Sequence, residues 1–448
     1  METAVANGVN HLSLQASPYT VALSAADRGN FDLKDATATK KVSEVLQENL
    51  DKHHILFTDA RHNHVAHQIL AIYALGASAD DVERIFRREA SYQRPRLPFE
   101  DSIVRAIADK RKFVDFLDNE LRYSSFLVFF QREIEAKGPK AVLDEHLFAN
   151  DDKANALLYR LFAGIMHPVI HLGYAFEFNQ PAILAEALAM ASVHERDTAG
   201  LCKYMMAAEK ASIGSGKAGS SSLRKILTEA RQVKKLREAG RKGSQIEKVK
   251  NVIPNAFDEL VHHASQYTIS TEQIEERMVE MLDIMTCTLA TIPDTPETYK
   301  ANFFLLHSVN SLVLWPSLLE HPWLSTENRT RLLEWQGRYN VLLVLAEDLP
   351  RLTPEDLAKC TNEPCSWDKL FRRAIEHRTD DGHLAKVIRA LAYGEQTSKD
   401  PKIKNRLSMK GDMWRKLANL SEFSNYHAVS SANNVLMDYS YGFVPRSG

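Results

Sequence analysis

The sequence predicts an all-α protein, with a single large helical domain over residues 1–448. Apolar residues recur at intervals of one helical turn wherever the chain is periodic, and alternating strand patterns bounded by turn dipeptides are scarce. Residues that cap helices stand where these patterns begin and end. The chain has 448 residues, 44% hydrophobic and 25% charged, so it is long enough to bury a sizeable core.

The first predicted helices follow one another closely. Residues 41–52 repeat apolar side chains one turn apart, and HVAHQILAIYALG continues the pattern until Gly76, which is placed to end that helix. Ser78 stands before an acidic first turn and predicts the start of a third helix. Thr295, followed by Pro296, predicts a start in the same way ahead of residues 299–314.

Two segments differ in composition from the rest. Residues 1–40 read as a polar N-terminal extension, and residues 211–250 as a flexible basic insertion in which a Gly/Ser/Ala-rich loop precedes a surface helix. We favour a solvated insertion over a basic docking site, because runs of charge usually lie exposed. The letters G-x-G-x-x-G occur at 214–219, but no strand precedes or follows them, so they predict no nucleotide-binding site.

Composition argues against several classes of protein. The formal net charge of -2 predicts neither nucleic-acid binding nor attraction to an anionic membrane. The first thirty residues lack the pattern of a signal or transit peptide, and no uninterrupted apolar run approaches the roughly 18 residues of a membrane span. We expect a cytoplasmic protein with reduced thiols, because its cysteines are scattered: Cys202, Cys287, Cys360 and Cys365.

Histidines gather in four separate helical segments that are otherwise apolar. A lone histidine in such a helix is usually a hydrogen-bonded core residue. Four such segments together indicate a shared metal site, because each buried imidazole needs polar partners and one metal would satisfy several of them. The segments carry His64 with His67, His167 with His171, His307, and His383 with Lys386.

Pro168 makes the second segment irregular in one of two ways. A proline inside a helix kinks it and frees a carbonyl one turn earlier, near Gly164; alternatively, the helix ends at His167. Other metal architectures fit the spacing poorly. A di-iron site needs two Glu-x-x-His motifs, of which only Glu259 to His262 is a helical example, and the zinc-protease motif His-Glu-x-x-His is absent.

Lys386 lies one helical turn after His383, so the two side chains project together. A cationic lysine would repel a metal. A neutral lysine amine can instead add carbon dioxide and become an anionic carbamate. Burial, nearby positive charge and a position near the helix N-terminus all favour the neutral amine, whereas Asp380 and Asp381 oppose it in part.

Taken in order, HNHVAHQILAIYALGAS, HPVIHLGYAFEF, LLHSVNSLV and DDGHLAKVIRAL resemble the questin oxidase-like family of fungal polyketide pathways. The resemblance runs from about residue 53 to 392. Within the family, the sequence is similar above all to members that open the anthraquinone ring with non-haem iron. It implies a helical fold that holds iron(II) by four histidines and a carboxylated lysine. The implied ligands are His64, His167, His307, His383 and Lys386 as its carbamate.

The resemblance leaves some choices open. His67 could replace His64, and His171 could replace His167. We prefer His64 for its place beside Asn63 at the expected helix start, and His167 for its place at the Pro168 irregularity. Nothing carries over to the N-terminal forty residues or to the insertion. Four aromatic residues near the candidate ligands could line a substrate pocket or belong to the core: Tyr174, Phe176, Phe303 and Trp315.

The resemblance implies an iron-dependent oxygenase that cleaves the central ring of an anthraquinone, or of its reduced form, with O2 to give a benzophenone-type product. Five protein ligands would leave iron one open position, so the aromatic polyketide substrate would bind beside the metal. NADPH could supply electrons directly or through a partner reductase. Two alternatives are a metal-free, NADPH-dependent Baeyer–Villiger-type monooxygenase and a non-catalytic helical scaffold.

Overall fold

The computed structural model describes residues 15–24, 36–59, 61–194, 200–215, 221–240, 245–290, 301–347, 354, 357 and 363–421. Within them no β-strand forms, and extended backbone makes only isolated bridges such as His53 with Pro95. The fold prediction of a single all-helical domain is therefore confirmed.

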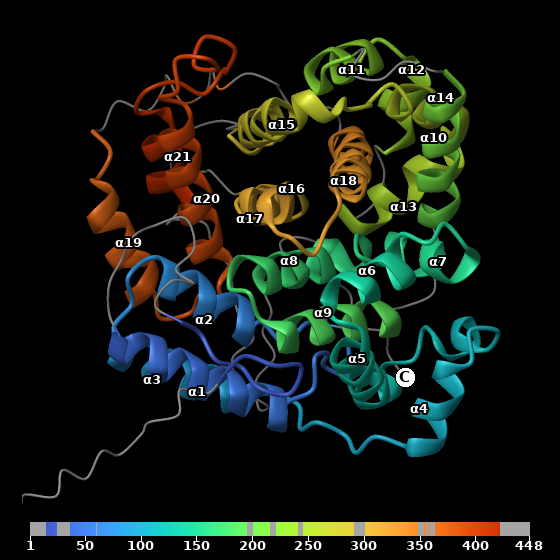
Figure 1. The fold of residues 1–448 in the computed structure, drawn as a ribbon. Helices are drawn as coiled ribbons and strands as arrows, with labels where there is room; N and C mark the ends of the chain where they lie inside the picture. Colours follow the sequence, from blue (N-terminus) through green and yellow to red (C-terminus); the bar gives the residue numbers. More distant parts are fainter. Residues whose placement is uncertain are drawn as a thin grey trace, which may run out of the picture.

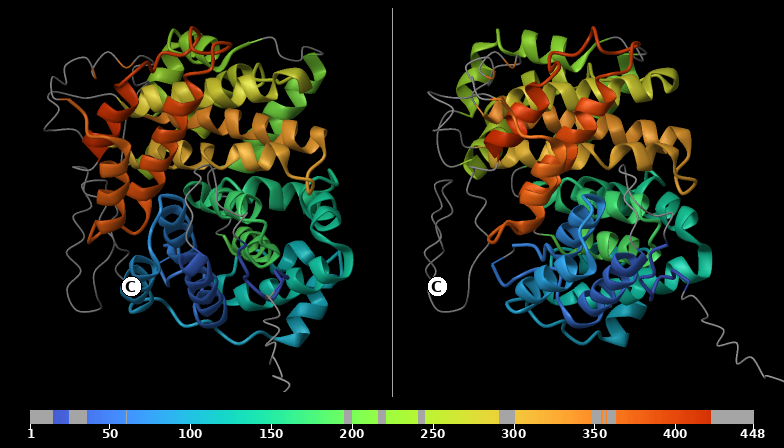
Figure 2. Two further views of the ribbon diagram at one scale, coloured as in Figure 1. Left: turned by 60° about the vertical axis from the view of Figure 1, so that its left-hand side comes forward. Right: turned by 90° about the vertical axis from the view of Figure 1, so that its left-hand side faces the viewer.

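The helices form two stacked halves that follow the order of the chain (Figures 1 and 2). The lower half in Figure 2 contains α1 (Ala36–Lys52), α2 (Val65–Ala74), α3 (Ala79–Ala90), α4 (Asp101–Ala108), η1 (Phe113–Phe116), η2 (Glu120–Arg122), α5 (Tyr123–Lys137), α6 (Pro139–Leu147), α7 (Asp152–Arg160), α8 (Ala163–Glu177) and α9 (Pro181–Val193).

The second half of the chain forms the upper layer, and its helices α19 and α20 reach down beside α2 (Figures 1 and 2). It contains α10 (Leu201–Ser215), α11 (Leu223–Ala230), α12 (Lys234–Ala239), α13 (Gln245–Asn255), α14 (Phe257–Ala264), η3 (Thr271–Gln273), α15 (Ile274–Leu289), α16 (Phe303–Leu312), α17 (Trp315–Glu320), α18 (Thr326–Ala346), α19 (Trp367–Glu376), α20 (His383–Thr397) and α21 (Met413–Ser421).

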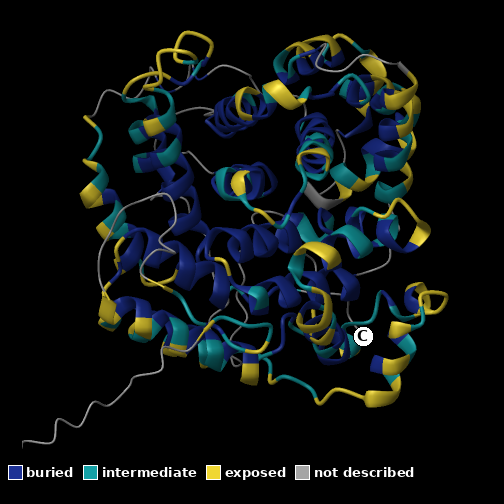
Figure 3. Ribbon diagram, in the orientation of Figure 1, coloured by how far each residue is buried: buried dark blue, intermediate teal, exposed yellow. Residues whose placement is uncertain are grey.

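The central helices are buried on nearly every side (Figure 3), as expected for helices that are apolar all round. Every residue of α2 is buried, as is every residue of α9 after its first proline. The segment Phe303–Glu320 has the length and apolar composition of a membrane span, but 78% of it is buried inside the protein. Helices α7 and α8 together pass the same test but are bent by 93°. Helix α9 packs within the first half, against α5 and α8, whereas α16 packs on α8 across the two halves.

The predicted helix ends agree with the structure where it describes them. Gly76 follows α2 with a φ of 90°, and Ser78 caps α3 in a reciprocal capping box with Asp81. The predicted start at Thr295 lies outside the described residues. Helix α16 begins at Phe303 behind a different cap, Asn302, whose side chain accepts from two backbone N–H groups.

The basic segment 211–250 differs from its prediction. Its first residues continue α10 to Ser215, and the part predicted as one surface helix forms α11, α12 and the start of α13. Leu223, Ile226 and Leu236 are buried, so the segment packs against the domain through apolar side chains spaced among its charges. The predicted N-terminal extension also ends early: α1 begins at Ala36, before the first strongly apolar residue of the helix.

Candidate metal centre

Four helices bring the predicted histidines to one place between the two halves. Helix α2 contacts α8 and α20, and α16 contacts the same two helices (Figure 1). His64 stands at the N-cap of α2, where the neighbouring Asn63 side chain accepts from the N–H of Val65. The other three candidates, His167, His307 and His383, lie on α8, α16 and α20.

The four imidazoles face one another through their Nε2 atoms. His64 Nε2 lies 2.8 Å from His167 Nε2, and His383 Nε2 lies 3.1 Å from His307 Nε2. The two pairs adjoin, because the ring centroids of His167 and His307 are 4.8 Å apart. His64, His167 and His383 each turn one ligand atom to within 4.8 Å of the others. The structure thus gathers all four histidines that the sequence singled out as ligands.

Backbone carbonyls fix the orientation of two of these rings. His167 Nδ1 donates to the carbonyl oxygen of Gly164 at 2.6 Å, and His307 Nδ1 donates to that of Phe303 at 2.6 Å. A carbonyl only accepts, so the proton of each neutral ring sits on Nδ1. Burial lowers the pKa of both imidazoles well below the usual value, which keeps them neutral. Their Nε2 lone pairs therefore point at the shared centre.

Asp381 orients the other two rings. One of its oxygens accepts from His64 Nδ1 at 2.9 Å, and the other accepts from His383 Nδ1. Burial alone would raise the pKa of Asp381, but His383 and His64 outweigh burial and hold it well below the usual range. Burial lowers the pKa of His383 to about 4 despite this carboxylate. Asp381 is thus an anionic acceptor that directs two Nε2 atoms inward.

This arrangement fits a transition metal. Facing lone pairs repel each other unless a cation lies between them. Two nitrogens bound to one metal at about 2.1 Å and at right angles lie about 3 Å apart, close to both of the observed Nε2 separations. Metal-binding histidines also characteristically donate their other N–H to a carboxylate or a carbonyl, as all four do here.

Lys386, the fifth predicted ligand, lies in the first turn of α20. Its side chain is fully buried, and Nζ has no hydrogen-bond partner among the described residues. Burial lowers the pKa of Lys386 to about 8, against the opposing charges of Asp381 and Asp380. Its charge in turn depresses the pKa of His307 and His383, so its amine lies close to the cluster.

Helix α8 begins in an unusual conformation beside His167. Gly164, Ile165 and Met166 all have positive φ values, of 54°, 56° and 66°. Regular helix follows, so Pro168 lies in its first turn, where its missing N–H costs little. Of the two alternatives for this segment, neither is right in detail: the proline is not deep inside a regular helix, and regular helix begins at His167 instead of ending there. The irregularity itself is present, and the carbonyl of Gly164 accepts from His167 Nδ1.

The two spare histidines form a separate pair. His67 Nε2 lies 3.1 Å from His171 Nδ1, and His171 Nε2 lies 3.3 Å from Glu186 Oε2. Both rings are one helical turn away from His64 and His167 along α2 and α8. The geometry therefore favours His64 and His167 as the ligands, which remains a prediction.

Two further histidines belong to the neighbourhood and were not predicted as site residues. His62 stacks on His167 with ring centroids 3.7 Å apart and planes 2° from parallel, and its Nε2 lies 2.9 Å from His194 Nε2. His62 could have been selected, since it lies in the same segment as His64. His194 could not, because it stands 132 residues away at the end of α9.

Of the four aromatic residues proposed for a pocket, Phe303 alone has ring contacts with the candidate ligands. Its ring lies 4.5 Å from His307 and 5.1 Å from His383, and it is half-buried. Tyr174 instead packs on His67, and Phe176 packs on His321 and Trp323.

Trp315 is buried at the start of α17. Tyr174, Phe176 and Trp315 are therefore core side chains in this structure.

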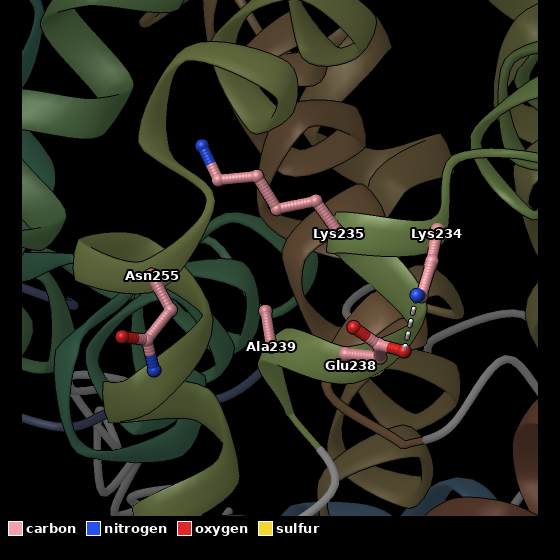
Figure 4. A pocket seen from close by; sticks show the side chains of 5 residues that line it. All are labelled: Lys234, Lys235, Glu238, Ala239 and Asn255. Atoms are coloured by element: carbon pink, nitrogen blue, oxygen red, sulfur yellow. Dashed lines mark ion pairs between the residues drawn. The ribbon is translucent and has the colours of Figure 1, made fainter.

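A surface hollow of about 410 Å³ lies elsewhere, on the basic segment (Figure 4). It is lined by Lys234, Lys235, Glu238, Ala239 and Asn255. Both lysines already have carboxylate partners, at 3.9 Å for Lys234 with Glu238 and 2.9 Å for Lys235 with Glu259. The hollow contains none of the residues of the histidine cluster.

Comparison with known proteins gives the class of this protein. The Baeyer-Villiger oxidase ptaJ of Pestalotiopsis fici is 32% identical over 387 residues, 85% of this chain and 86% of the relative. The questin oxidase of Aspergillus terreus is 32% identical over 392 residues, 86% of this chain and 87% of that enzyme. The questin oxidase of Aspergillus fumigatus is 30% identical over 394 residues, 86% of this chain and 88% of the relative. The protein is thus of the class of oxidative enzymes.

A family model described as questin oxidase-like matches residues 61–391. The chain belongs to the questin oxidase-like family, which confirms the resemblance that the four histidine motifs indicated. The matched range includes every candidate ligand, from His64 to Lys386.

Proposed function

We propose that this protein is a non-haem iron-dependent oxygenase that opens the central ring of an anthraquinone with O2 and yields a benzophenone-type product. The observation that carries the proposal is the convergence of four imidazole Nε2 atoms whose Nδ1 atoms all donate outward. The substrate class is taken from the relatives named questin oxidase.

Iron would be held by His64, His167, His307 and His383, with Lys386 as the fifth ligand in its carbamate form. Imidazole is a neutral ligand, and the carboxylate of Asp381 already accepts hydrogen bonds from two of the four rings. A carbamate on Lys386 would supply an anionic oxygen at this position and would remove a buried cation. When bound, iron(II) supplies the capacity to activate O2.

The chain's own residues would position the substrate and exclude water. His307 and Lys386 are fully buried, whereas the side chains of His64 and Asp381 are 14% exposed, so the cluster comes nearest to solvent on their side. Phe303 is also half-buried and lies against two of the ligands. Its ring offers an apolar face on which a flat aromatic substrate can stack.

The relatives named Baeyer-Villiger oxidase favour oxygen insertion next to a carbonyl, and they also support a second candidate function. That candidate is a metal-free, NADPH-dependent monooxygenase on the same substrate class. In the iron-dependent proposal, NADPH or a partner reductase would serve only to reduce the anthraquinone before ring opening.

The decisive experiment combines metal analysis with turnover of questin under O2. We expect about one iron per chain, loss of ring cleavage after chelation, and recovery with iron(II) but not with zinc(II). Turnover under ¹⁸O2 should place labelled oxygen in the product. Ring cleavage by metal-depleted protein with stoichiometric NADPH consumption would overturn the proposal in favour of the second candidate. Protein free of metal and without activity would indicate a non-catalytic scaffold.

A further inference from the structure

The segment between α19 and α20 determines where Asp381 lies. This connector, residues 377–382, ends directly before His383 and contains the carboxylate that accepts from both His64 and His383. Asp381 thus joins a candidate ligand from the first half of the chain to one from the second half. Because its side chain is short, the position of the connector backbone decides whether Asp381 reaches both rings.

Arg88 on α3 binds three backbone carbonyl groups of the connector. Its Nη1 donates to the carbonyl oxygens of His377 at 3.1 Å and Arg378 at 2.6 Å, and its Nη2 donates to that of Asp380. Its Nε donates to Oε1 of Glu89 at 2.8 Å, and Glu89 is only 1% exposed. One guanidinium, anchored on a buried carboxylate, therefore ties a helix of the first half to the connector of the second half.

The backbone is also fixed on either side of Asp381 by other contacts. Gln68 on α2 donates from Nε2 to the carbonyl oxygen of Asp380 at 2.6 Å. The carboxylate of Asp380 in turn accepts from the N–H of Leu384 at 2.9 Å, in the first turn of α20. Gly382 has a φ of 101°, and a Cβ there would lie 2.8 Å from Cβ of Gln68. The connector therefore packs closely on α2 as well as on α3.

The shape of the guanidinium matters here more than its charge. Arginine offers a planar fork of donors in fixed directions, whereas lysine offers three donors on one nitrogen and cannot reach carbonyls from residue 377 to residue 380 together. Arg87 has the same charge and lies on the same helix, but its side chain is 76% exposed and pairs with Glu83. Arg87 therefore provides a matched comparison for Arg88.

We propose that Arg88 is a positioning residue of the candidate metal centre, whose guanidinium holds the connector so that Asp381 reaches His64 and His383 together. It acts through the backbone of the connector and then through Asp381. The inference rests on the proposed function, because the direction of the two Nε2 atoms matters only when a metal binds them. A purely structural role would stabilise the fold and leave the metal site unchanged.

The test compares Arg88→Lys with Arg87→Lys, since both variants keep the charge of α3. Cobalt(II) replaces iron(II) as the probe, because it shifts the NMR signals of the N–H protons of bound imidazoles far from all others. We expect four shifted signals in the wild-type protein and in Arg87→Lys, one from each Nδ1 that donates to an oxygen.

In Arg88→Lys only two of these signals should change. Those of His64 and His383 should broaden or vanish through exchange with solvent, because Asp381 no longer holds both rings. Those of His167 and His307 should stay, because backbone carbonyls hold them. Affinity for cobalt(II), measured by competition with a chelator, should fall about tenfold, the lower end of the range for losing a partner of a metal-binding histidine.

The result that overturns the inference is equally specific. Four intact signals and an unchanged affinity in Arg88→Lys would show that Arg88 is structural only, even where urea unfolding shows a loss of stability. If Arg88→Lys does not fold, Gln68→Leu removes the other donor to the carbonyl of Asp380 and should weaken the same two signals. Four intact signals in that variant would then overturn the inference.

A measurement on metal-free protein separates this inference from the proposed function. Amide hydrogen exchange over residues 377–385 should be faster in Arg88→Lys than in Arg87→Lys, and equal rates would show that Arg88 does not hold the connector. Wild-type protein that binds neither iron(II) nor cobalt(II) overturns the proposed function, and the positioning role with it. Wild-type protein that binds metal, with unchanged signals in Arg88→Lys, overturns the positioning role alone.

Discussion

At the scale of single residues, the groups behind the imidazoles define the site as much as the imidazoles themselves. Asp381 accepts from two candidate ligands at once, and two backbone carbonyls accept from the others. These contacts determine which nitrogen of each ring carries the proton. A histidine with its proton on Nε2 could not bind a metal through that atom, so the acceptors are as necessary as the rings.

Replacing Asp381 by Asn tests this orienting role. The amide is neutral and can donate, so it would hold His64 and His383 less firmly in the required tautomer. We expect iron affinity to fall about 10- to 100-fold, the usual effect of removing such a partner, as measured by competition with a chelator. Asp412→Asn is the control, because Asp412 is an exposed partner of Lys416. Equal affinity in both variants would contradict the assigned role.

Replacing Lys386 tests the carbamate directly. Arg cannot add carbon dioxide and keeps a buried cation, so Lys386→Arg should lose most of its iron. Lys386→Glu offers a permanent carboxylate and should keep more. Wild-type protein incubated with ¹³C-bicarbonate should show a carbamate carbon signal by NMR that is absent from Lys386→Arg. As control, Lys153→Arg alters another buried lysine, which is paired with Glu145, and should retain both the signal and the metal.

At the scale of elements, the start of α8 links an unfavourable backbone to the position of a candidate ligand. Three successive residues from Gly164 to Met166 adopt positive φ, which costs a β-branched residue such as Ile165 about 1–3 kcal/mol. The turn they make presents the carbonyl of Gly164 to His167 Nδ1. A Cβ at position 164 would also lie 2.1 Å from a ring carbon of His194. Glycine is therefore required both by the positive φ and by this close contact.

Gly164→Ala should therefore destabilise the protein by more than a positive φ alone explains. Gly411→Ala is the matched control, since Gly411 has a φ of 56° and open space around its missing Cβ. We expect the control to cost about 1–2 kcal/mol and Gly164→Ala to cost more in urea unfolding. The Gly164 variant should also bind iron more weakly, because His167 depends on this turn. Equal losses of stability would show that the contact with His194 is unimportant.

At the scale of the whole molecule, the candidate centre lies between the two halves of the chain. Helices α2 and α8 come from the first half, and α16 and α20 from the second. Burial there keeps several histidines neutral. Burial lowers the pKa of His383 to about 4. The pKa of His194 also falls to about 4, through burial and, less strongly, the charge of Arg160. Folding thus depends on uncharged imidazoles in the interior.

This burial predicts a fall in stability on mild acidification of the metal-free protein. An unfolded histidine titrates near pH 6.5, whereas folded His194 titrates at about 4. Between these pH values the unfolded state binds more protons than the folded state. The contribution of His194 to the free energy of unfolding is therefore fully present above pH 6.5 and is lost as the pH falls towards 4. His194 alone accounts for about 3 kcal/mol. Urea unfolding at pH 7 and pH 4.5 measures the loss, which His194→Gln should reduce; a flat profile would contradict the prediction.

The amino-acid sequence by itself determined the helical class and indicated which segments carry the histidines of the candidate centre. Helical periodicity is a local property of neighbouring residues, so the all-α fold and the helix ends at Gly76 and Ser78 were predictable. The histidine motifs are also local, and their order carried the family resemblance. The basic segment was predicted as a loop and one exposed helix because its apolar residues are few. That residues such as Leu223 are buried depends on the helices they pack against, which the local sequence does not show.

Only the tertiary structure decided how these residues work together. It showed that His64 and His167 face each other in the candidate centre, whereas His67 and His171, one helical turn further along, form hydrogen bonds that lead to Glu186. The contact of Asp381 with His64 spans 317 residues, and no local pattern predicts contacts between residues so far apart in the chain. The candidate ligands lie in short motifs of the sequence, whereas the hydrogen-bond partners that determine which ring nitrogen carries the proton come near them only in the folded protein.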